Sequence, residues 1–218
     1  MANSSLCCPC TPVAESRPAP LVVYVVDDDA SIRDSLALML GLSGYATRLF
    51  ADAESFLVAF EAGWSGCVVA DLRLPGMSGV ELQSRVRSRG SAIPFVIITA
   101  HGDVPAARTA FRAQAVDFIE KPFDEAQLRS AIDTAFALER RRIDAAGLRR
   151  ADLEKLSRLT AREREVLEHA VKGLHAKEIA ALLGISPRTV EVHRTRIMEK
   201  LEVRNIAELV RFAVAAER

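Results

Sequence analysis

LVVYVVDDD at residues 21–29 decides the fold of this chain. Six uncharged residues run directly into three aspartates, and the apolar run lacks the alternation of a half-exposed strand. A continuous apolar strand is typical of a parallel sheet that helices cover on both faces. In open sheets of this kind, ligands bind beyond the carboxyl ends of the strands. The stretch therefore predicts a parallel sheet with a polar site at its carboxyl edge.

Further segments repeat the alternation of strand and helix. The other predicted strands are YATRLF (45–50), GCVVA (66–70), PFVIIT (94–99) and DFIE (117–120). The predicted helices are one with Ile32, Leu36, Met39 and Leu40 on one face, one with Phe56, Leu57 and Phe60, one from Val80, one from Ala106 to Ala115, and one from Asp124 onward. Five strand-helix units predict a doubly wound, five-stranded α/β domain over residues 21–138.

Five polar residues follow the predicted strands, namely Asp27, Asp28, Asp71, Thr99 and Lys121. Because parallel strands bring their carboxyl ends to one edge of the sheet, we expect these side chains to meet there. Three carboxylates in one place repel each other and raise their pKa values unless a cation neutralises them. Mg²⁺ suits the site because it prefers oxygen ligands and commonly joins carboxylates to a phosphate.

Asp71 is the candidate nucleophile at this edge. It stands alone after a central strand and precedes the loop LPGMSG (74–79), which leaves room for in-line approach to a phosphoryl group. A carboxylate nucleophile would form an acyl phosphate, and Lys121 and Thr99 can then supply a positive charge and a hydrogen bond. Each polar residue alone is compatible with an ordinary turn, and the combination is what indicates a site.

The N-terminal leader, residues 1–20, holds four prolines and little periodicity, which predicts a disordered extension. Cys7, Cys8 and Cys10 lie in this leader. A zinc site needs four suitably spaced ligands, so we interpret these three thiols, with no histidine nearby, as incidental. No run approaches the roughly 18 apolar residues of a membrane span. The sequence predicts a soluble cytoplasmic protein with no membrane partner.

The net charge of zero conceals a difference between the two halves of the chain. Residues 21–137 hold 10 Lys and Arg against 15 Asp and Glu, a net charge of −5, and residues 138–218 hold 18 against 13, a net charge of +5. An acidic half suits a metal or phosphoryl site, and a basic half suits a nucleic-acid reader. Small domains often differ by a few charges, so a difference without function stays open.

Residues 139–156 are charged and poor in turn residues, which predicts a helical linker that can also pair with a copy of itself. Beyond it, residues 157–218 carry no further strand pattern and predict a small all-α domain. The first helix of this domain begins with a T-x-x-E capping box formed by Thr160 and Glu163.

A second and a third helix follow. AKEIAALL at 176–183 ends at Gly184, and then Ser186 can cap a third helix that has Pro187 in its first turn. Two helices joined by a tight turn that contains glycine are typical of a helix-turn-helix motif, in which the second helix enters the DNA major groove.

The third helix has one apolar stripe and one polar face. Val190, Ile197 and Leu201 fall on the stripe that faces the other helices. Arginines on the opposite face suit phosphates or guanine, Glu191 can accept from cytosine, and Val192 with Thr195 can contact thymine methyl groups. A merely solvated face remains the alternative. The candidate DNA contacts are Lys177, Ser186, Arg188, Thr189, Glu191, Val192, His193, Thr195, Arg196 and Lys200.

VVYVVDDDA, ADLRLPGMSG, IITAHGD and DFIEKPF together resemble the receiver domain of bacterial two-component response regulators. The resemblance implies a flavodoxin-like sheet with strand order 2-1-3-4-5 and Asp71 as phosphoacceptor. It also implies a phosphohistidine on a partner sensor histidine kinase as the donor.

The resemblance further assigns roles within the acidic site. Asp28 and Asp71 would bind Mg²⁺ together with the backbone carbonyl of Arg73, while Asp27 would act through water. Thr99 and Lys121 would sense the phosphoryl group, and Phe118 occupies the aromatic switch position. Arg73 is bulky for its position, which affects the expected phosphoryl lifetime rather than metal binding.

LTAREREVLEHAVKGLHAKEIAALLGISPRTVEVHRTRIMEKL (159–201) resembles the LuxR-type helix-turn-helix. With the receiver, it makes the chain similar to the FixJ/NarL class of transcriptional regulators. That similarity implies promoter DNA and RNA polymerase as partners, activation of transcription, and a homodimer when phosphorylated. Ala176 stands where the class usually has Asn, so we expect the second helix to lack a capping side chain, at a cost of about 1 kcal/mol, and to depend on Lys177 as its anchor.

Two other functions stay open at this point. One is a Mg²⁺-dependent phosphohydrolase with Asp71 as nucleophile, although no substrate cap is evident. The other is a regulator that binds DNA regardless of phosphorylation. The last amphipathic segment, NIAELVRFAVAA (205–216), either packs within its own domain through Ile206, Leu209, Val210 and Ala213 or forms a dimer seam.

Overall fold

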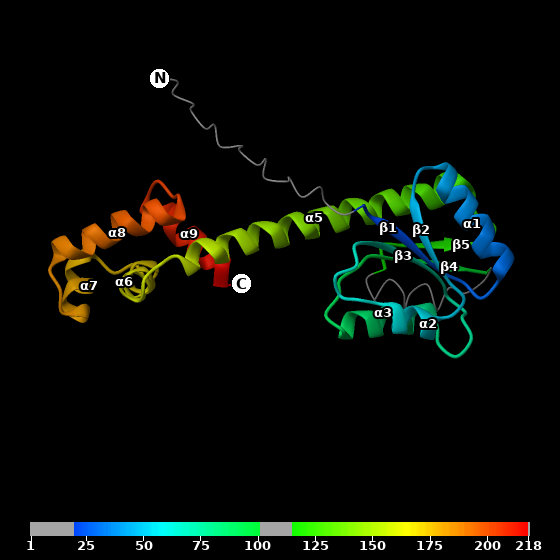
Figure 1. Cartoon of the computed structure of the whole chain (residues 1–218), viewed down its shortest axis with the longest axis horizontal. Helices are drawn as coiled ribbons and strands as arrows, with labels where there is room; N and C mark the ends of the chain where they lie inside the picture. The colour runs from blue at the N-terminus through cyan, green and yellow to red at the C-terminus, as the bar shows by residue number, and fades with distance from the viewer. Residues whose placement is uncertain (1–19, 101–114, 218) are drawn as a thin grey trace, which may run out of the picture. The chain divides into compact units, whose positions relative to one another are not determined.

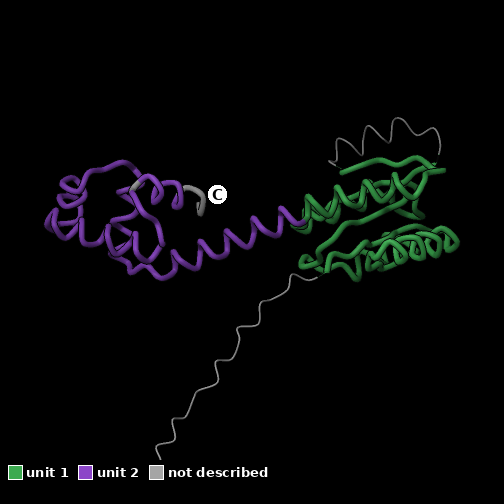
Figure 2. Tube along the Cα trace, turned by 90° about the horizontal axis from the view of Figure 1, so that it is seen from above, with its two compact units in different colours: residues 1–139 green, residues 140–218 purple. Residues whose placement is uncertain are grey.

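The computed structural model describes residues 20–100 and 115–217 (Figure 1). The chain divides into two compact units, residues 1–139 and 140–218 (Figure 2). The predicted disordered leader lies outside the described residues, and so does nearly all of the helix predicted at 106–115. No helix in the part of the chain that the structure describes is long and apolar enough to cross a membrane.

The first unit contains the predicted five-stranded parallel sheet. Its strands are β1 (Val22–Val26), β2 (Ala46–Phe50), β3 (Gly66–Asp71), β4 (Phe95–Thr99) and β5 (Asp117–Glu120). Their order in the sheet is β2-β1-β3-β4-β5, and each neighbouring pair is parallel. The fold class and strand order predicted from the sequence are confirmed.

Helices cover both faces of this sheet (Figure 1). They are α1 (Ala30–Leu42), α2 (Ala53–Ala59), α3 (Gly79–Ser88) and the first part of α5 (Glu125–Ser157). Tyr24 and Val26 pack into the apolar core on the α2 and α3 side, whereas Val23 and Val25 pack into the core on the α1 and α5 side. Because both faces of β1 are buried, apolar residues are favoured at every position and the strand shows no alternation. Burial of each aliphatic side chain contributes roughly 1.5–3 kcal/mol to the free energy of unfolding.

Helix α5 joins the helix predicted from Asp124 onward to the predicted helical linker. It runs without a break over 33 residues, from Glu125 to Ser157, and includes all of the predicted linker at 139–156. Leu128, Ile132 and Phe136 are buried in the first unit. Beyond Arg140 the helix is mostly exposed, and its exposed side chains include Leu148 and Leu153.

The second unit is entirely helical beyond α5. Its helices are α6 (Ala161–Val171), α7 (Ala176–Leu183), α8 (Pro187–Leu201) and α9 (Ile206–Glu217). The capping box of Thr160 and Glu163 opens α6 as predicted, and Ser186 caps α8 by accepting from the Thr189 N–H. Helix α9 packs on its own unit, because Leu209 and Ala213 are buried in the core shared by α6, α7 and α8.

The capping prediction for α7 was wrong by one residue. Ala176 is the first helical residue, and the N-cap is His175 in an extended conformation. The Glu178 carboxylate accepts from the His175 N–H at 2.7 Å, so one N-terminal donor is satisfied without a side chain at position 176. The cost expected for Ala176 therefore does not arise, because the capping position precedes it.

Candidate functional site

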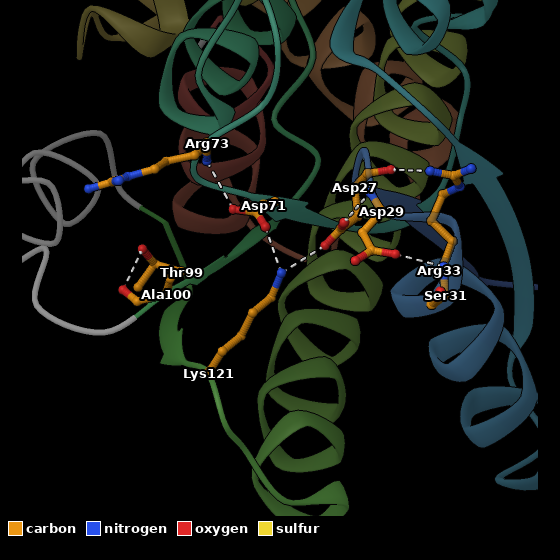
Figure 3. A network of polar contacts seen from close by, with 9 residues as sticks. All are labelled: Asp27, Asp29, Ser31, Arg33, Asp71, Arg73, Thr99, Ala100 and Lys121. Atoms are coloured by element: carbon orange, nitrogen blue, oxygen red, sulfur yellow. Dashed lines mark hydrogen bonds and ion pairs between the residues drawn. The ribbon is translucent and has the colours of Figure 1, made fainter.

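The carboxyl edge of the sheet brings together acidic and basic side chains from β1, β3 and β5 (Figure 3). The Lys121 ammonium donates to Asp71 Oδ2 at 2.6 Å and to Asp27 Oδ2 at 2.9 Å. These three residues are 94 positions apart at most in sequence and meet only because their strands end together. The edge at which the sequence predicts a site therefore holds the predicted residue types.

Burial decides the electrostatics of this cluster. Only 2% of Asp27 is exposed, and burial raises the pKa of its carboxyl group, which hydrogen bonds from Lys121 and from the Asp29 N–H only partly offset. Burial alone would lower the pKa of Lys121, but its hydrogen bonds to Asp71 and Asp27 outweigh burial and raise it. The site thus favours cations beside its carboxylates.

The donor set fits a hard divalent cation. Carboxylate oxygens of Asp27, Asp28 and Asp71 all lie within 4.8 Å of one another. Asp27 is buried and Asp28 is exposed, so the oxygens face both the protein and the solvent. Mg²⁺ commonly binds through one or two carboxylates and keeps several of its waters. A cluster that is partly open to solvent can supply the carboxylates and leave room for the waters.

Arg73 follows the candidate nucleophile closely. Its backbone N–H donates to Asp71 Oδ1 at 2.9 Å, while its side chain extends away from the carboxylates (Figure 3). Bulk at this position is thus directed out of the cluster. The Asp71 carboxylate is held at both oxygens, since Lys121 binds the other one.

The two predicted switch residues lie on neighbouring strands. Thr99 is 1% exposed, and its hydroxyl donates to the carbonyl of Ala100 at 3.2 Å rather than to the acidic cluster. Phe118 is half-buried and packs against the core on the α2 and α3 side. It pairs with Ile97, two residues before Thr99, so Thr99 and Phe118 project from the same face of the sheet.

Three supporting features of the site escaped sequence reasoning. Asp29 caps α1 by accepting from the Ser31 N–H at 2.8 Å. The Arg33 guanidinium donates to the main-chain carbonyl of Asp27 at 2.7 Å. Ser78 and Glu81 form a capping box at the start of α3, and the S-x-x-E spacing in the sequence is the signal that predicts it.

Gly79 lies directly against the candidate nucleophile. A Cβ atom at this position would overlap with the carbonyl oxygen of Asp71. The Gly79 N–H donates to the Leu72 carbonyl at 3.0 Å. The absence of a side chain therefore lets the first turn of α3 pack on the backbone of the Asp71 loop.

An apolar groove adjoins the acidic cluster. Its volume is about 370 Å³. Helix α1 forms one wall and the segment after β5 forms the other, and the lining residues are Ser31, Ile32, Ser35, Leu36, Met39, Lys121, Pro122 and Phe123. Lys121 is common to the groove and the cluster, so the groove lies beside the residue that binds the candidate nucleophile.

The second unit presents a polar face on α8. Val190, Ile197 and Leu201 are buried as the helical periodicity predicts. The predicted DNA contacts that are exposed are Arg188, Thr189, Glu191, Val192, Thr195 and Arg196 on α8, together with Ser186 before it and Lys177 on α7. Glu199 on α8 is exposed as well. Val192 is 44% exposed, so an aliphatic side chain lies among the polar residues of this face.

Two of the predicted DNA contacts, Lys200 and His193, are partly buried in the unit. The Lys200 ammonium donates to Glu163 Oε2 at 2.6 Å and to the carbonyl of Arg158 at 3.3 Å. Lys200 thus ties the last turn of α8 to the start of α6. His193 is half-buried, and its Nδ1 atom is buried away from solvent.

Comparisons with protein families divide the chain in the same way. Residues 23–133 match the response regulator receiver domain. Residues 157–213 match the bacterial regulatory proteins of the luxR family.

Known proteins match nearly the whole chain. The transcriptional regulatory protein FixJ of Rhizobium meliloti (strain 1021) is 45% identical over 196 residues, which are 88% of this chain and 95% of that protein. The FixJ of Bradyrhizobium diazoefficiens is 41% identical over 89% of this chain and 95% of its own length. Among solved structures, the response regulator StyR matches with a TM-score of 0.78 and 42% identity, covering 90% of this chain and 99% of StyR.

Full-length FixJ from B. japonicum matches with a TM-score of 0.55 and 42% identity, over 90% of this chain and 97% of that structure. A receiver domain and a LuxR-type domain in one chain, with relatives at this level of identity and coverage, show the family. The chain belongs to the two-component response regulators that join a receiver domain to a LuxR-type helix-turn-helix domain.

Proposed function

We propose that this chain is a transcriptional activator that a sensor histidine kinase switches on by phosphorylating Asp71. The phosphorylated chain dimerises, binds promoter DNA and recruits RNA polymerase. In this scheme residues 21–138 act as the receiver, 139–156 as a helical linker and 157–218 as the DNA-binding domain. The observation that supports the proposal most strongly is the contact of Asp71 with Lys121 beside two further carboxylates.

The acidic cluster supplies the groups for phosphoryl transfer. Asp71 is the nucleophile: its carboxylate oxygen bonds to phosphorus while the bond from phosphorus to the kinase imidazole breaks, and that nitrogen keeps the electron pair. Mg²⁺, when bound, offsets the negative charge of the phosphoryl group. Asp28, Asp71 and the carbonyl of Arg73 would hold the ion, and Asp27 would act through water.

Phosphorylation rearranges the hydrogen bonds of the cluster. The Lys121 ammonium, now shared by Asp71 and Asp27, would move to a phosphoryl oxygen. The Thr99 hydroxyl would exchange the Ala100 carbonyl for another phosphoryl oxygen, and Phe118 would turn inward beside it. Moving a two-state equilibrium from 1:99 to 99:1 takes roughly 5.5 kcal/mol of differential stabilisation.

The apolar groove beside Lys121 is the surface that receives the kinase. Apolar lining from Ile32, Leu36 and Met39 suits the side chains of a helix that carries the phosphohistidine. The exposed Leu38 and Leu42 extend the apolar surface of α1. The groove shares Lys121 with the cluster, so a helix bound there places its histidine next to Asp71.

The exposed face of α8 reads DNA in the proposed complex. Arg188, Arg196 and Lys177 would contact phosphates or guanine edges. Exposed Val192 and Thr195 suit thymine methyl groups, Glu191 suits cytosine, and Ser186 and Thr189 lie at the helix start. We leave Lys200 and His193 out of the proposed contacts, because the Lys200 ammonium is bound to Glu163 and the Nδ1 atom of His193 is buried.

A twofold-symmetric dimer would occupy half-sites about one helical turn apart on the DNA.

The family to which the chain belongs consists of DNA-binding response regulators rather than enzymes, which removes the phosphohydrolase alternative. A regulator that binds DNA regardless of phosphorylation remains the rival that experiment must separate.

The experiment uses the full chain and a DNA site selected from random duplexes with acetyl-phosphate-treated protein. Sedimentation velocity and fluorescence anisotropy then compare wild type and Asp71→Asn, each with and without acetyl phosphate and Mg²⁺. We expect dimerisation and tighter DNA binding only for treated wild type. Equal dimer content and affinity in all four samples would support constitutive binding and contradict the proposal.

A further inference from the structure

We propose that Arg33 is a positioning residue for divalent-cation binding at the acidic cluster. Its guanidinium fixes the backbone turn that carries Asp27 and Asp28. The inference rests on the proposed role of this cluster as a Mg²⁺ site. It concerns a residue of α1 that is no ligand and that holds the ligands in place.

The geometry shows a tether between the strand end and the helix. Arg33 Nη1 donates to the carbonyl of Asp27 at 2.7 Å, and the Arg33 N–H donates to the carbonyl of Asp29 at 3.0 Å. The second bond is the backbone hydrogen bond that opens α1 and does not depend on the side chain, so the tether specific to arginine is the guanidinium bond to the Asp27 carbonyl. The Asp27 N–H in turn donates to the Phe50 carbonyl at 3.2 Å, which fixes the start of the turn.

Arg33 and Lys121 approach Asp27 from opposite sides (Figure 3). Lys121 occupies carboxylate oxygens, which a bound cation and a phosphoryl group would compete for. The bond from Arg33 goes to a main-chain carbonyl and occupies no carboxylate oxygen. It can therefore persist whatever the carboxylates bind.

Local helix preference does not explain an arginine at this position. Arg33 is the fourth residue of α1, where the positive end of the helix dipole favours acidic side chains and disfavours cations. A residue that opposes local preference needs a compensating role. The hydrogen bond to the Asp27 carbonyl provides that compensation.

Two effects of Arg33 on a cation have opposite signs, which makes the inference testable. Its positive charge repels Mg²⁺, so removing only a charge would tighten binding. Its tether orders the turn before the cation arrives, so removing the tether would weaken binding. We infer that the tether dominates, because the bond is short and charge-assisted.

The test is calorimetric titration of MgCl₂ into unphosphorylated full-length protein, without phosphodonor or DNA. Arg33→Lys keeps the charge but cannot present the planar guanidinium, and Arg33→Gln removes both charge and guanidinium. We expect the Kd for Mg²⁺ to rise about tenfold in Arg33→Lys, as loss of a charge-assisted hydrogen bond predicts. In Arg33→Gln the rise should be smaller, because loss of the positive charge partly offsets loss of the tether.

Arg89→Gln is the matched control. The Arg89 guanidinium also donates to a main-chain carbonyl, that of Leu57 at 2.5 Å, within the same unit and away from the carboxylates. The control changes the net charge equally and should leave the Kd for Mg²⁺ within about twofold of wild type, because charges beyond a Debye length of roughly 10 Å are screened. The Mg²⁺-induced rise in Tm is a second readout that does not require identical stability.

Each result decides between the alternatives. An unchanged Kd in Arg33→Lys, or tighter binding by Arg33→Gln, would mean that Arg33 acts only by charge and would overturn the inference. An effect of equal size in Arg89→Gln would do the same. If wild type itself fails to bind Mg²⁺, the proposed function fails as well, so the two failures are distinguishable.

Discussion

Lys121 Nζ lies 2.6 Å from Asp71 Oδ2, so the candidate phosphoacceptor already carries a bound cation from its own chain. The same ammonium lies 2.9 Å from Asp27 Oδ2. A metal ion that binds these carboxylates has to compete with the ammonium. The ammonium therefore offsets only part of the negative charge of the three carboxylates, and phosphorylation has to redistribute that charge.

Replacing Lys121 by Met should tighten Mg²⁺ binding and impair the response to phosphorylation. The Kd for Mg²⁺ should fall by roughly tenfold. Removing one nearby positive charge from a partly buried site changes the free energy of binding a cation by about 1.4 kcal/mol, the same energy as a pKa shift of about one unit. Calorimetry measures the first effect, and DNA-binding anisotropy after acetyl phosphate treatment measures the second. Weaker Mg²⁺ binding by the variant would show that Lys121 orders the carboxylates instead of competing for them.

Replacing Gly79 by Ala should destabilise the first unit and displace Asp71. The added Cβ would overlap with the Asp71 carbonyl, and overpacking of this kind costs about 1–3 kcal/mol. Urea unfolding and the rate of phosphorylation by acetyl phosphate measure the two effects. Gly41→Ala is the control, since Gly41 lies inside α1 with no atom within 4 Å of an added Cβ, and it should stabilise by about 1 kcal/mol.

The buried ion pair of Glu163 and Lys200 should make the second unit sensitive to acid. Glu163 is 3% exposed; burial acts to raise its pKa, but hydrogen bonds from Lys200 and Thr160 lower it below the ordinary 4.5. A lowered folded-state pKa means that the stabilisation is complete above pH 4.5 and disappears as the pH falls through the folded value.

Glu163→Gln should therefore lower the stability of this unit by about 2 kcal/mol at neutral pH. The loss should shrink towards acidic pH, because wild type then loses the same charge. Chemical unfolding followed at several pH values tests this, with Glu165→Gln as control, since Glu165 forms an exposed pair with Arg162. A loss that does not vary with pH would point to packing rather than charge.

Arg196 and Lys200 should differ in DNA binding although both are basic residues of α8. Arg196 is exposed, and its replacement by Ala should reduce the slope of log K against log salt by about 1. Lys200→Met should leave that slope near the wild-type value and lower the Tm, because its ammonium is bound to Glu163. Salt titrations of DNA binding decide this, and a reduced slope for Lys200→Met would place Lys200 on the DNA instead.

The parts of the fold that depend on burial pattern were predictable. The apolar run itself predicts that both faces of the first strand are buried, and Val23 and Tyr24 are buried on opposite faces. The order of the strands was predicted from the family resemblance instead, and it is confirmed. The buried stripe of Val190, Ile197 and Leu201 was equally clear, because helical period and residue type agree.

Features that depend on exact chain path were not predictable. The bond from Arg33 to the Asp27 carbonyl requires one rotamer and one turn geometry, neither of which a sequence pattern specifies. The groove beside Lys121 needs two segments that are far apart in sequence. Helix boundaries shift by a residue, as His175 shows. Helix α8 ends at Leu201, and Glu202 caps it in a left-handed conformation where Gly or Asn would be anticipated.

The most direct measurement is tandem mass spectrometry of full-length protein incubated with acetyl phosphate and MgCl₂. The account predicts one added phosphoryl group, located at Asp71, which is absent from Asp71→Asn and from samples treated with EDTA. No added group, or an added group at Asp27 or Asp28 with Asp71 unmodified, would contradict it.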